Sequence, residues 1–494
     1  MSPKTEIHPA ASAPRTGKKL LFVAAEAMPF AATGGLGDVI GSLPAAIAAA
    51  DPDADVRVVI PLYGQVVGKW REMMTKEIAF TVSLAWRNQY CGIFSLHRDG
   101  VTYYFIDNEY YFKRPSLYGA YDDGERYAFF CKATLDMMPQ IGFYPDILHA
   151  HDWQAALSVI YLNTLYRNAP GYEKMRSVFT IHNIEYQGKY DFAILEDIFN
   201  LGYEQYGLLN YGGCINLMKA AIQCADRVTT VSPTYAAEIM TPEYSHGLYH
   251  CLRANAAKVS GILNGIDYTY YDPAHDPAIA VPYDADHPEK KAEDKTALQR
   301  ELSLPEDKKL PLLAIISRLA PHKGIDLVTE IAYNLMERHA VQFVILGTGE
   351  DAYESFFREL QDRFPDRVRA LITYDRDLSK RIYAAADLFL MPSRSEPCGL
   401  AQMIASRYGA IPVTRETGGL ADSIKGYWEK DGKILGNGFT FANYSSAELL
   451  ERTEAAIALY HDSERHTALV RKIMQTDFSW GQSALKYLEL YAGL

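Results

Sequence analysis

The chain has 494 residues, of which 48% are hydrophobic and 12% aromatic, a composition that predicts a globular protein with a large core and two or three domains. Its formal net charge of −12 argues against a nucleic acid or another polyanion as partner. No apolar run reaches the roughly 18 residues of a membrane span, and residues 1–17 lack the apolar core of a signal peptide and are expected to be disordered. The six cysteines form no C-x-x-C pair, which favours free thiols and, by default, the cytoplasm.

The first half of the chain, residues 18–260, alternates short apolar runs with amphipathic runs. This pattern predicts an α/β domain with a mostly parallel sheet. Residues 78–106 alternate more regularly between apolar and polar positions, which favours an antiparallel insertion. We expect strands at residues 20–25, 56–61, 101–107, 146–150, 177–181 and 227–231, and helices at residues 39–50, 125–138, 153–166 and 215–224.

A glycine-rich stretch, TGGLGD at residues 33–38, lies between the first strand and the first helix. Its glycines would let the backbone approach a ligand, and the N–H groups of the following helix would favour an anion, so one interpretation is a phosphate site. An ordinary tight turn explains the stretch equally well. The residue three positions after Gly37 is Ile40, so the G-x-G-x-x-G fingerprint of NAD-linked oxidoreductases is incomplete.

The second half of the chain begins with a segment, residues 268–308, that we expect to be a linker, because Asp, Pro and Tyr recur in it without a period. A second α/β series follows. The hexapeptide TGGLAD at residues 417–422 nearly repeats the earlier stretch, and two explanations of this similarity remain open, related turns in two similar domains or chance. Two α/β domains in tandem predict a cleft, with ligands beyond the carboxyl ends of the strands. The series begins at residues 309–317, and we expect strands at residues 312–316, 342–347, 368–374, 387–392 and 410–414.

Polar residues gather where strands of the first half end. Asp152 follows the strand at residues 146–150, and His182 and Asn183 follow the strand at residues 177–181. Such side chains bind hydroxyl groups, and a nearby Trp or Tyr can stack on a sugar ring, so a sugar ligand fits this set. The structural alternative, equally supported, is that Asp152 caps a helix and that His151 is a core histidine with satisfied hydrogen bonds. For His149 a structural role is favoured.

Two loops of the second half carry charged residues. Arg318 and Lys323 follow the strand at residues 312–316 and could clamp a diphosphate. Two solvated basic residues are the commoner case in general, but less so beyond a buried strand in an acidic protein. The loop SRSEPCGL at residues 393–400 places Glu396 before a helix predicted to start at Gly399 and Leu400, whose N–H groups would face phosphate. Cys398 is expected to be a packing thiol. The sequence has no G-x-S-x-G, H-E-x-x-H or Walker A motif, and we expect no metal dependence.

These stretches, in this order over residues 18–494, resemble those of bacterial glycogen synthases and plant starch synthases. The resemblance implies two Rossmann-like domains facing a cleft, the GT-B type, and a retaining glucosyltransferase. It implies transfer of glucose from ADP-glucose to the non-reducing end of an α-1,4-glucan without a metal or cofactor. The predicted parts are a disordered segment, 1–17, an acceptor-side domain, 18–260, a nucleotide-sugar domain with its linker, 261–476, and a helix crossing back to the first domain, 477–494.

The resemblance also implies roles for individual residues. Arg318 and Lys323 match the diphosphate-binding pair, Glu396 matches the carboxylate beside the donor glucose, and His182 matches a histidine on that glucose. The catalytic set includes Asp152 as well. The remaining matches are Gly35, Gly399 and Leu400 at the phosphates, Tyr374 at the base, and Asp38, Asp152, Asn183 and Asn264 on the sugar and acceptor side.

One position departs from the family pattern. The residue before the first TGGL motif is usually lysine, and here it is Ala32. The favoured interpretation is an active synthase, and the alternative is a glucan-binding or priming relative with weakened catalysis. The position eight residues after Glu396, acidic in many related transferases, is Ile404, so we favour same-face attack by the acceptor. The sequence leaves the choice between ADP-glucose and UDP-glucose open.

Overall fold

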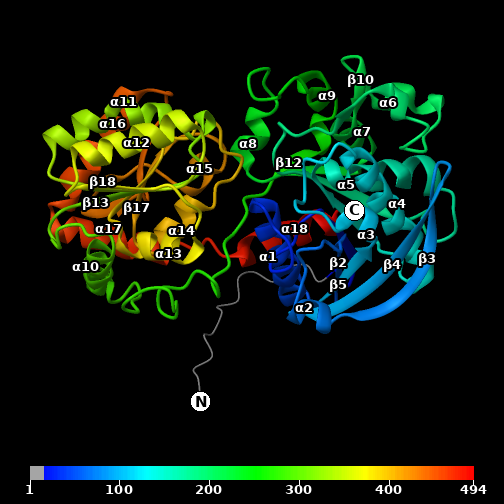
Figure 1. The fold of residues 1–494 in the computed structure, drawn as a ribbon, viewed down its shortest axis with the longest axis horizontal. Coiled ribbons are helices and arrows are strands. Elements are labelled where there is room, and N and C mark those ends of the chain that lie inside the picture. The colour runs from blue at the N-terminus through cyan, green and yellow to red at the C-terminus, as the bar shows by residue number, and fades with distance from the viewer. Residues whose placement is uncertain (1–15) are drawn as a thin grey trace. The chain divides into compact units, whose positions relative to one another are not determined.

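The computed structural model describes residues 16–494, which form two compact units (Figure 1). Unit 1 contains the described residues up to Val231 together with Ala236–Gly265 and Trp480–Leu494. Unit 2 contains Ser232–Tyr235 and Ile266–Ser479. Of the segment expected to be disordered, residues 1–17, all but the last two positions lie outside the described residues.

Unit 1 is built on a nine-stranded sheet. Its strands are β1 (Lys19–Val23), β2 (Asp55–Pro61), β3 (Thr75–Leu84), β4 (Arg87–Arg98), β5 (Val101–Asp107), β6 (Ile147–His151), β7 (Arg176–Ile181), β11 (Arg227–Thr230) and β12 (Val259–Gly261). They lie in the order β12-β11-β7-β6-β1-β2-β5-β4-β3. Residues Leu20 to Val23 of β1 are completely buried, as expected of a central strand covered on both faces.

The antiparallel part of unit 1 extends the main sheet. β4 pairs antiparallel with both β3 and β5, and β5 in turn pairs parallel with β2. The antiparallel pairing expected at residues 78–106 is therefore present, and it is continuous with the parallel part of the sheet. The reason is that β5 is a buried, nearly continuous apolar strand that joins both kinds of partner.

Helices pack around this sheet. The helix predicted at residues 215–224 begins at Leu217, because Cys214–Asn216 form a short strand, β10, and the Asn216 side chain caps the helix by accepting a hydrogen bond from Lys219 N at 2.9 Å. The helix predicted at residues 153–166 ends in a π-helical turn. The helices and short strands are α1 (Gly35–Ala50), α2 (Lys69–Glu72), α3 (Glu109–Phe112), α4 (Asp123–Ile141), α5 (Asp152–Tyr161), η1 (Leu162–Tyr166), β8 (Lys189–Tyr190), α6 (Tyr206–Leu209), β9 (Asn210–Tyr211), β10, α7 (Leu217–Cys224), α9 (Tyr249–Ala254) and α18 (Trp480–Ala492).

The last helix of the chain belongs to unit 1. α18 packs against α1, and Tyr487 and Tyr491 are completely buried. The Tyr491 hydroxyl is hydrogen-bonded to His149 Nδ1 at 2.7 Å, which ties α18 to β6. The chain therefore completes the core of unit 1 only after it has passed through unit 2.

Unit 2 is built on a six-stranded parallel sheet in the order β15-β14-β13-β16-β17-β20. Its strands are β13 (Leu312–Ile316), β14 (Gln342–Leu346), β15 (Val368–Leu371), β16 (Leu388–Met391), β17 (Ile411–Arg415) and β20 (Phe439–Phe441). Its helices are α10 (Lys291–Glu301), α11 (Ile325–Arg338), α12 (Asp351–Arg363), α13 (Arg376–Ala385), α14 (Ala401–Arg407), α15 (Gly418–Ser423), α16 (Ser446–Tyr460) and α17 (Ser463–Gln475), and β18 (Trp428–Lys430) and β19 (Lys433–Leu435) form a hairpin. The prediction of two α/β parts with mostly parallel sheets is confirmed.

The segment expected to be a linker, residues 268–308, is part of unit 2 and ends in a well-packed helix. α10 packs against α13, and its buried positions include Lys291, Lys295 and Leu298. The linker prediction is wrong here because two of these positions are lysines, which bury their stems while their ammonium groups find acceptors. The helices were predicted from apolar residues that recur every three or four positions, and this pattern does not detect a buried face made partly of lysines.

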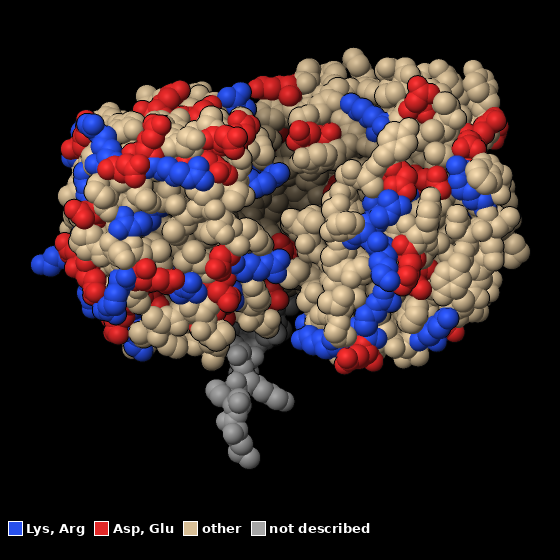
Figure 2. All heavy atoms as spheres, viewed as in Figure 1, with Lys and Arg blue, Asp and Glu red and all other residues tan. Residues whose placement is uncertain are grey.

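The surface carries charged side chains of both signs (Figure 2). Figure 2 shows basic and acidic side chains interspersed over the face in view. Among residues 16–494, no helix is long and apolar enough to cross a membrane. All six cysteines lie within these residues, and none of them forms a disulfide.

Candidate functional site

Three neighbouring strands of unit 1 end in the loops singled out from the sequence. β1 lies beside β6, β6 lies beside β7, and all three run parallel. The carboxyl ends of parallel neighbours meet at the same edge of a sheet, which is where open α/β sheets bind ligands. The stretch TGGLGD, Asp152 and His182 therefore lie along one edge of this sheet.

The buried carboxylate of Glu26 holds the TGGLGD loop in place through hydrogen bonds. Its side chain, 3% exposed, accepts hydrogen bonds from Thr33 N at 2.6 Å, Thr33 Oγ1 at 2.7 Å and the Tyr118 hydroxyl at 2.6 Å. Gly35 opens α1 and has no heavy atom within 4 Å of the place where a Cβ would lie, so its exposed face is free for a ligand. Asp38 lies in the first turn of α1 and is partly buried.

Sequence reasoning missed Glu26. The available signal was a lone carboxylate in the apolar run that leads to the loop, at residues 20–28. A buried carboxylate needs several donors, and the nearby TGG backbone supplies them.

Asp152 joins two of these loops. It is the first residue of α5, with a left-handed φ of 57°, and its Oδ1 accepts a hydrogen bond from His182 N at 2.8 Å. The alternative that Asp152 caps α5 is wrong, because the N-cap is His151 and the carboxylate is directed to the β7 loop. Burial raises the pKa of Asp152 to about 7, and the negative charge of Glu26 contributes to the rise. Asn183, the next residue of that loop, accepts from Glu185 N at 3.0 Å through its own side chain.

His182 is hydrogen-bonded to a second histidine. Its Nε2 lies 2.9 Å from His151 Nδ1, and His151 is completely buried with no hydrogen-bond partner at its Nε2 among the described residues. Burial lowers the pKa of both imidazoles, that of His182 to about 3, so both are neutral at physiological pH. His149 is structural, as expected, with partners at both ring nitrogens: Tyr491 at 2.7 Å and Thr180 at 2.6 Å.

Acid should destabilise unit 1 through His182. Its pKa is about 3 in the folded chain against an ordinary value of 6.5, so below pH 6.5 the unfolded chain gains a proton that the folded chain does not bind. The free energy of unfolding should therefore fall as the pH drops from 6.5 towards 3, and by pH 5 this one group accounts for about 2 kcal/mol.

The measurement is urea unfolding of the protein and of His182→Gln, followed by tryptophan fluorescence at pH 7 and pH 5. The variant should lose about 2 kcal/mol less on acidification. An identical pH dependence in the two proteins would show that His182 titrates normally when folded.

In unit 2 the parallel neighbours β13 and β16 bring two predicted residues into contact. Lys323 Nζ, in the turn after β13, donates to Glu396 Oε2 at 2.7 Å, and Glu396 also accepts from Ser393 Oγ at 3.0 Å. Glu396 is 6% exposed. Arg318 is exposed in the same turn region, with Nη2 lying 3.3 Å from His322 Nε2. A buried carboxylate, a paired ammonium and a guanidinium exposed to solvent therefore share one edge of the sheet.

The helix predicted to start at Gly399 and Leu400 starts later. α14 begins at Ala401 with Leu400 as its N-cap, and Gly399 has a left-handed φ of 70°. The prediction of a helix start at Gly399 is wrong because this residue makes the turn before the helix. Gln402 Nε2 donates to the Gly399 carbonyl at 2.8 Å and fixes that turn.

The two TGGL hexapeptides both open helices after a strand, but they differ in their surroundings. A Cβ on Gly418 would lie 2.0 Å from the Glu396 carbonyl oxygen, and Gly419 N donates to the same oxygen at 3.1 Å. The second hexapeptide therefore packs directly against the loop that carries Glu396. The first, at Gly35, faces open space.

Two predicted residues lie apart from these clusters. Tyr374 follows the edge strand β15, is 77% exposed, and accepts a hydrogen bond from Arg376 Nε at 3.0 Å. Asn264 follows β12, the edge strand of unit 1, and its buried Oδ1 has no partner among the described residues. Cys398 is buried, consistent with a packing thiol.

Comparisons with known proteins agree with this arrangement. A family model described as the starch synthase catalytic domain matches residues 19–254, and one described as glycosyl transferases group 1 matches residues 295–473. A glycogen synthase of Anoxybacillus flavithermus is 46% identical over 475 residues, which cover 96% of this chain and 97% of the relative. A glycogen synthase of Bacillus subtilis is 45% identical over 475 residues, with the same coverage.

Two solved structures share the fold. The catalytic domain of starch synthase IV from Arabidopsis thaliana, solved with ADP and acarbose, superposes with a TM-score of 0.88 at 36% identity and covers 97% of this chain and 99% of that chain. Sucrose-phosphate synthase from Thermosynechococcus elongatus superposes with a TM-score of 0.61 at 16% identity, covering 96% of this chain and 98% of that one, which shows the shared fold alone.

Proposed function

Since the chain belongs to the glycogen and starch synthase family, we propose that it transfers glucose from ADP-glucose to the non-reducing end of an α-1,4-glucan with retention of configuration. The observation that supports the proposal is the ion pair between Lys323 and Glu396, with Arg318 in the loop that carries Lys323. The cytoplasm is the setting that suits six cysteines without a disulfide.

The Lys323–Glu396 pair suggests how the site receives its donor. The ammonium of Lys323 is paired with the carboxylate of Glu396 at 2.7 Å. A diphosphate offers that lysine more negative charge than one carboxylate does. As Lys323 turns to the diphosphate, Glu396 becomes free to accept a hydrogen bond from a sugar hydroxyl. Binding of the donor would thus exchange the ion pair of Lys323 with Glu396 for one with the diphosphate, and Glu396 would keep the hydrogen bond from Ser393 and gain one from the sugar.

The chemical step follows from charge development. When the bond between glucose and the diphosphate breaks, negative charge grows on the leaving group, and Arg318 and Lys323 stabilise it more in the transition state than in the ground state. These two cations take the part that a metal plays in other phosphate chemistry, so we propose that no metal is required.

His182 would act as a hydrogen-bond donor to the sugar. Each neutral imidazole carries one proton, and the buried Nε2 of His151 has no partner. An unpaired lone pair is tolerated better in the interior than an unpaired N–H group, so the proton of His151 sits on Nδ1 and is donated to His182 Nε2. His182 then carries its own proton on Nδ1, which is the atom available to a sugar oxygen.

The test of the proposal is ADP release. Purified protein with ADP-glucose and glycogen should release ADP, and a parallel assay with UDP-glucose measures the base preference that the sequence leaves open. Absence of ADP release from a folded protein would favour the alternative, a glucan-binding or priming relative.

Restoring the family's lysine should improve donor binding. Ala32 precedes Thr33, whose backbone N–H is held by Glu26, so a lysine there would extend from an anchored loop. We expect Ala32→Lys to lower the KM for the donor about fivefold, the value of roughly 1 kcal/mol for one partly exposed charge pair. Steady-state kinetics with varied donor concentration measures this effect.

The control for this variant is Ala32→Met, which adds a side chain of similar length without charge. Its KM should stay near that of the parent chain. Equal KM values for the Lys and Met variants would mean that the introduced lysine pairs with Glu26 rather than with the donor.

A further inference from the structure

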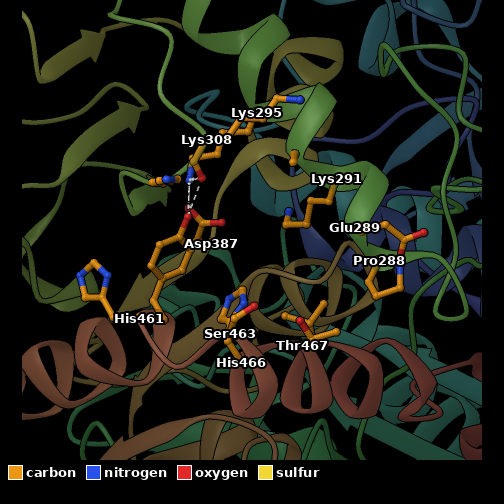
Figure 3. A pocket seen from close by; sticks show the side chains of 14 residues that line it. Pro288, Glu289, Lys291, Lys295, Lys308, Asp387, His461, Ser463, His466 and Thr467 are labelled. Carbon is orange, nitrogen blue, oxygen red and sulfur yellow. Dashed lines mark hydrogen bonds and ion pairs between the residues drawn. The ribbon is translucent and has the colours of Figure 1, made fainter.

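Unit 2 contains a cavity of about 510 Å³ that the reaction does not use (Figure 3). Asp387, which lines it, directly precedes β16, and its Oδ2 accepts a hydrogen bond from Leu312 N at the start of β13. The cavity therefore lies at the amino ends of the strands whose carboxyl ends carry Arg318, Lys323 and Glu396. A ligand bound there would occupy the opposite edge of the same sheet.

The lining of the cavity is basic, although the chain as a whole is acidic. Four lysines oppose two carboxylates, a formal charge of 4 − 2 = +2, whereas the whole chain carries −12. One of the carboxylates, Asp387, is already neutralised by Lys295 at 2.6 Å. Three lysines therefore face a single remaining carboxylate, Glu289. The ionisable lining residues are Lys291, Lys295, Lys308, Lys309, His461, His466 and Tyr460 with Glu289 and Asp387.

Lys291 is the most unusual of these residues. It is 6% exposed, and its Nζ donates to the carbonyl oxygens of Tyr383 at 3.0 Å and Ala384 at 2.5 Å, in the last turn of α13. An ammonium has three N–H groups, so two carbonyls leave one donor unused. Burial lowers the pKa of Lys291 to about 7, which an anion bound next to it would reverse.

The opposite wall supplies further groups that suit a phosphate. Figure 3 shows Ser463, His466 and Thr467 on the wall facing Lys291 and Glu289. The three residues belong to the first turns of α17, where the helix dipole favours an anion. His466 Nε2 is buried and has no hydrogen-bond partner among the described residues, although its ring can donate or accept.

We propose that this cavity binds a small phosphate monoester, with Lys308, Lys309 and Lys291 as its cationic partners and Ser463, His466 and Thr467 as hydrogen-bonding partners. The volume exceeds what one inorganic phosphate fills and lies within the range of small-ligand sites. The hydroxyl groups of the lining would bind the polar part of such an ester. The proposal stands independently of the transfer reaction.

Isothermal titration calorimetry with glycerol 3-phosphate tests the proposal on the full chain, with inorganic phosphate and glycerol as comparison probes. The ester should bind, phosphate should bind more weakly, and glycerol should not bind. The double variant Lys308→Ala with Lys309→Ala removes two exposed lysines of the lining and should weaken binding by about tenfold or more.

Matched variants separate this cavity from other sites. Lys430→Ala removes an exposed lysine of the same unit from β18 and should leave the affinity unchanged. Arg318→Ala should do the same, because Arg318 lies at the other edge of the sheet. Thr467→Trp would fill the cavity and abolish binding, with circular dichroism to verify the fold.

Three results would overturn the proposal. One is the absence of any binding by the parent chain. Another is equal affinity in the parent chain and in the Lys308/Lys309 double variant. The third is loss of binding in Arg318→Ala, which would assign the ester to the transfer site.

Discussion

Replacing Glu396 with glutamine should lower kcat for glucosyl transfer by about 10²–10³-fold, the usual cost of removing one group that stabilises charge in a transition state. The substitution keeps the shape of the side chain and removes the charge that Lys323 contacts at 2.7 Å. ADP release under saturating donor and glycogen measures kcat. Because the buried ion pair is lost, thermal unfolding of the variant must be measured as well.

Ser393→Ala provides the matched control for Glu396. It removes the hydrogen bond of 3.0 Å that Ser393 donates to Glu396 but leaves the carboxylate and its pairing with Lys323. A loss of roughly tenfold in kcat is expected from one hydrogen bond to a charged group, worth about 1.5 kcal/mol. Near-normal turnover by a folded Glu396→Gln variant would refute the role assigned to Glu396.

Arg318→Ala should also lower kcat by about 10²-fold, with a smaller effect on the KM for the donor. Arg318 is exposed beside His322, so its removal leaves no buried charge and the stability of the protein should be unchanged. The larger effect on kcat follows because negative charge on the leaving diphosphate grows as the bond breaks. Steady-state kinetics, with guanidinium chloride added at low concentration to test for rescue, measures the effect.

Arg381→Ala is the matched control for Arg318. Arg381 lies on α13 and is paired with Glu301 at 2.9 Å, away from the strand ends that carry the site. Its substitution should leave both kinetic constants unchanged. If Arg318→Ala raised only KM and left kcat intact, Arg318 would contribute uniform binding of the donor rather than stabilisation of the transition state.

Much of the fold was predictable because its central strands are continuous apolar runs bounded by polar loops. β5 and β13 have the predicted bounds, and β16 lies within the predicted range. α10 escaped prediction because lysines, rather than apolar residues, form part of its buried face. The start of α14 was placed too early because Gly399 adopts a left-handed conformation, which the sequence does not reveal.

The candidate site, like the fold, was predictable only in part. Residues at strand ends, such as Asp152 and Lys323, could be selected from the sequence because topology alone brings those ends to one edge. Their partners Glu396 and His182 were selected in the same way, but the pairing was not predicted, since the Lys323–Glu396 contact joins positions 73 residues apart in the chain. Glu26 was missed because its role depends on the backbone conformation of the loop that it supports.

The return of α18 to unit 1 has a consequence for biosynthesis. A ribosome completes all residues of unit 2, up to Ser479, before Tyr487 and Tyr491 emerge to cover α1 and to bond with His149. Although domains usually fold in order from the N-terminus, the nascent first unit must wait with part of its apolar surface exposed while the second unit is synthesised. Unit 1 is thus synthesised first but completes its folding last, and chaperones that recognise exposed apolar segments would bind it in that interval.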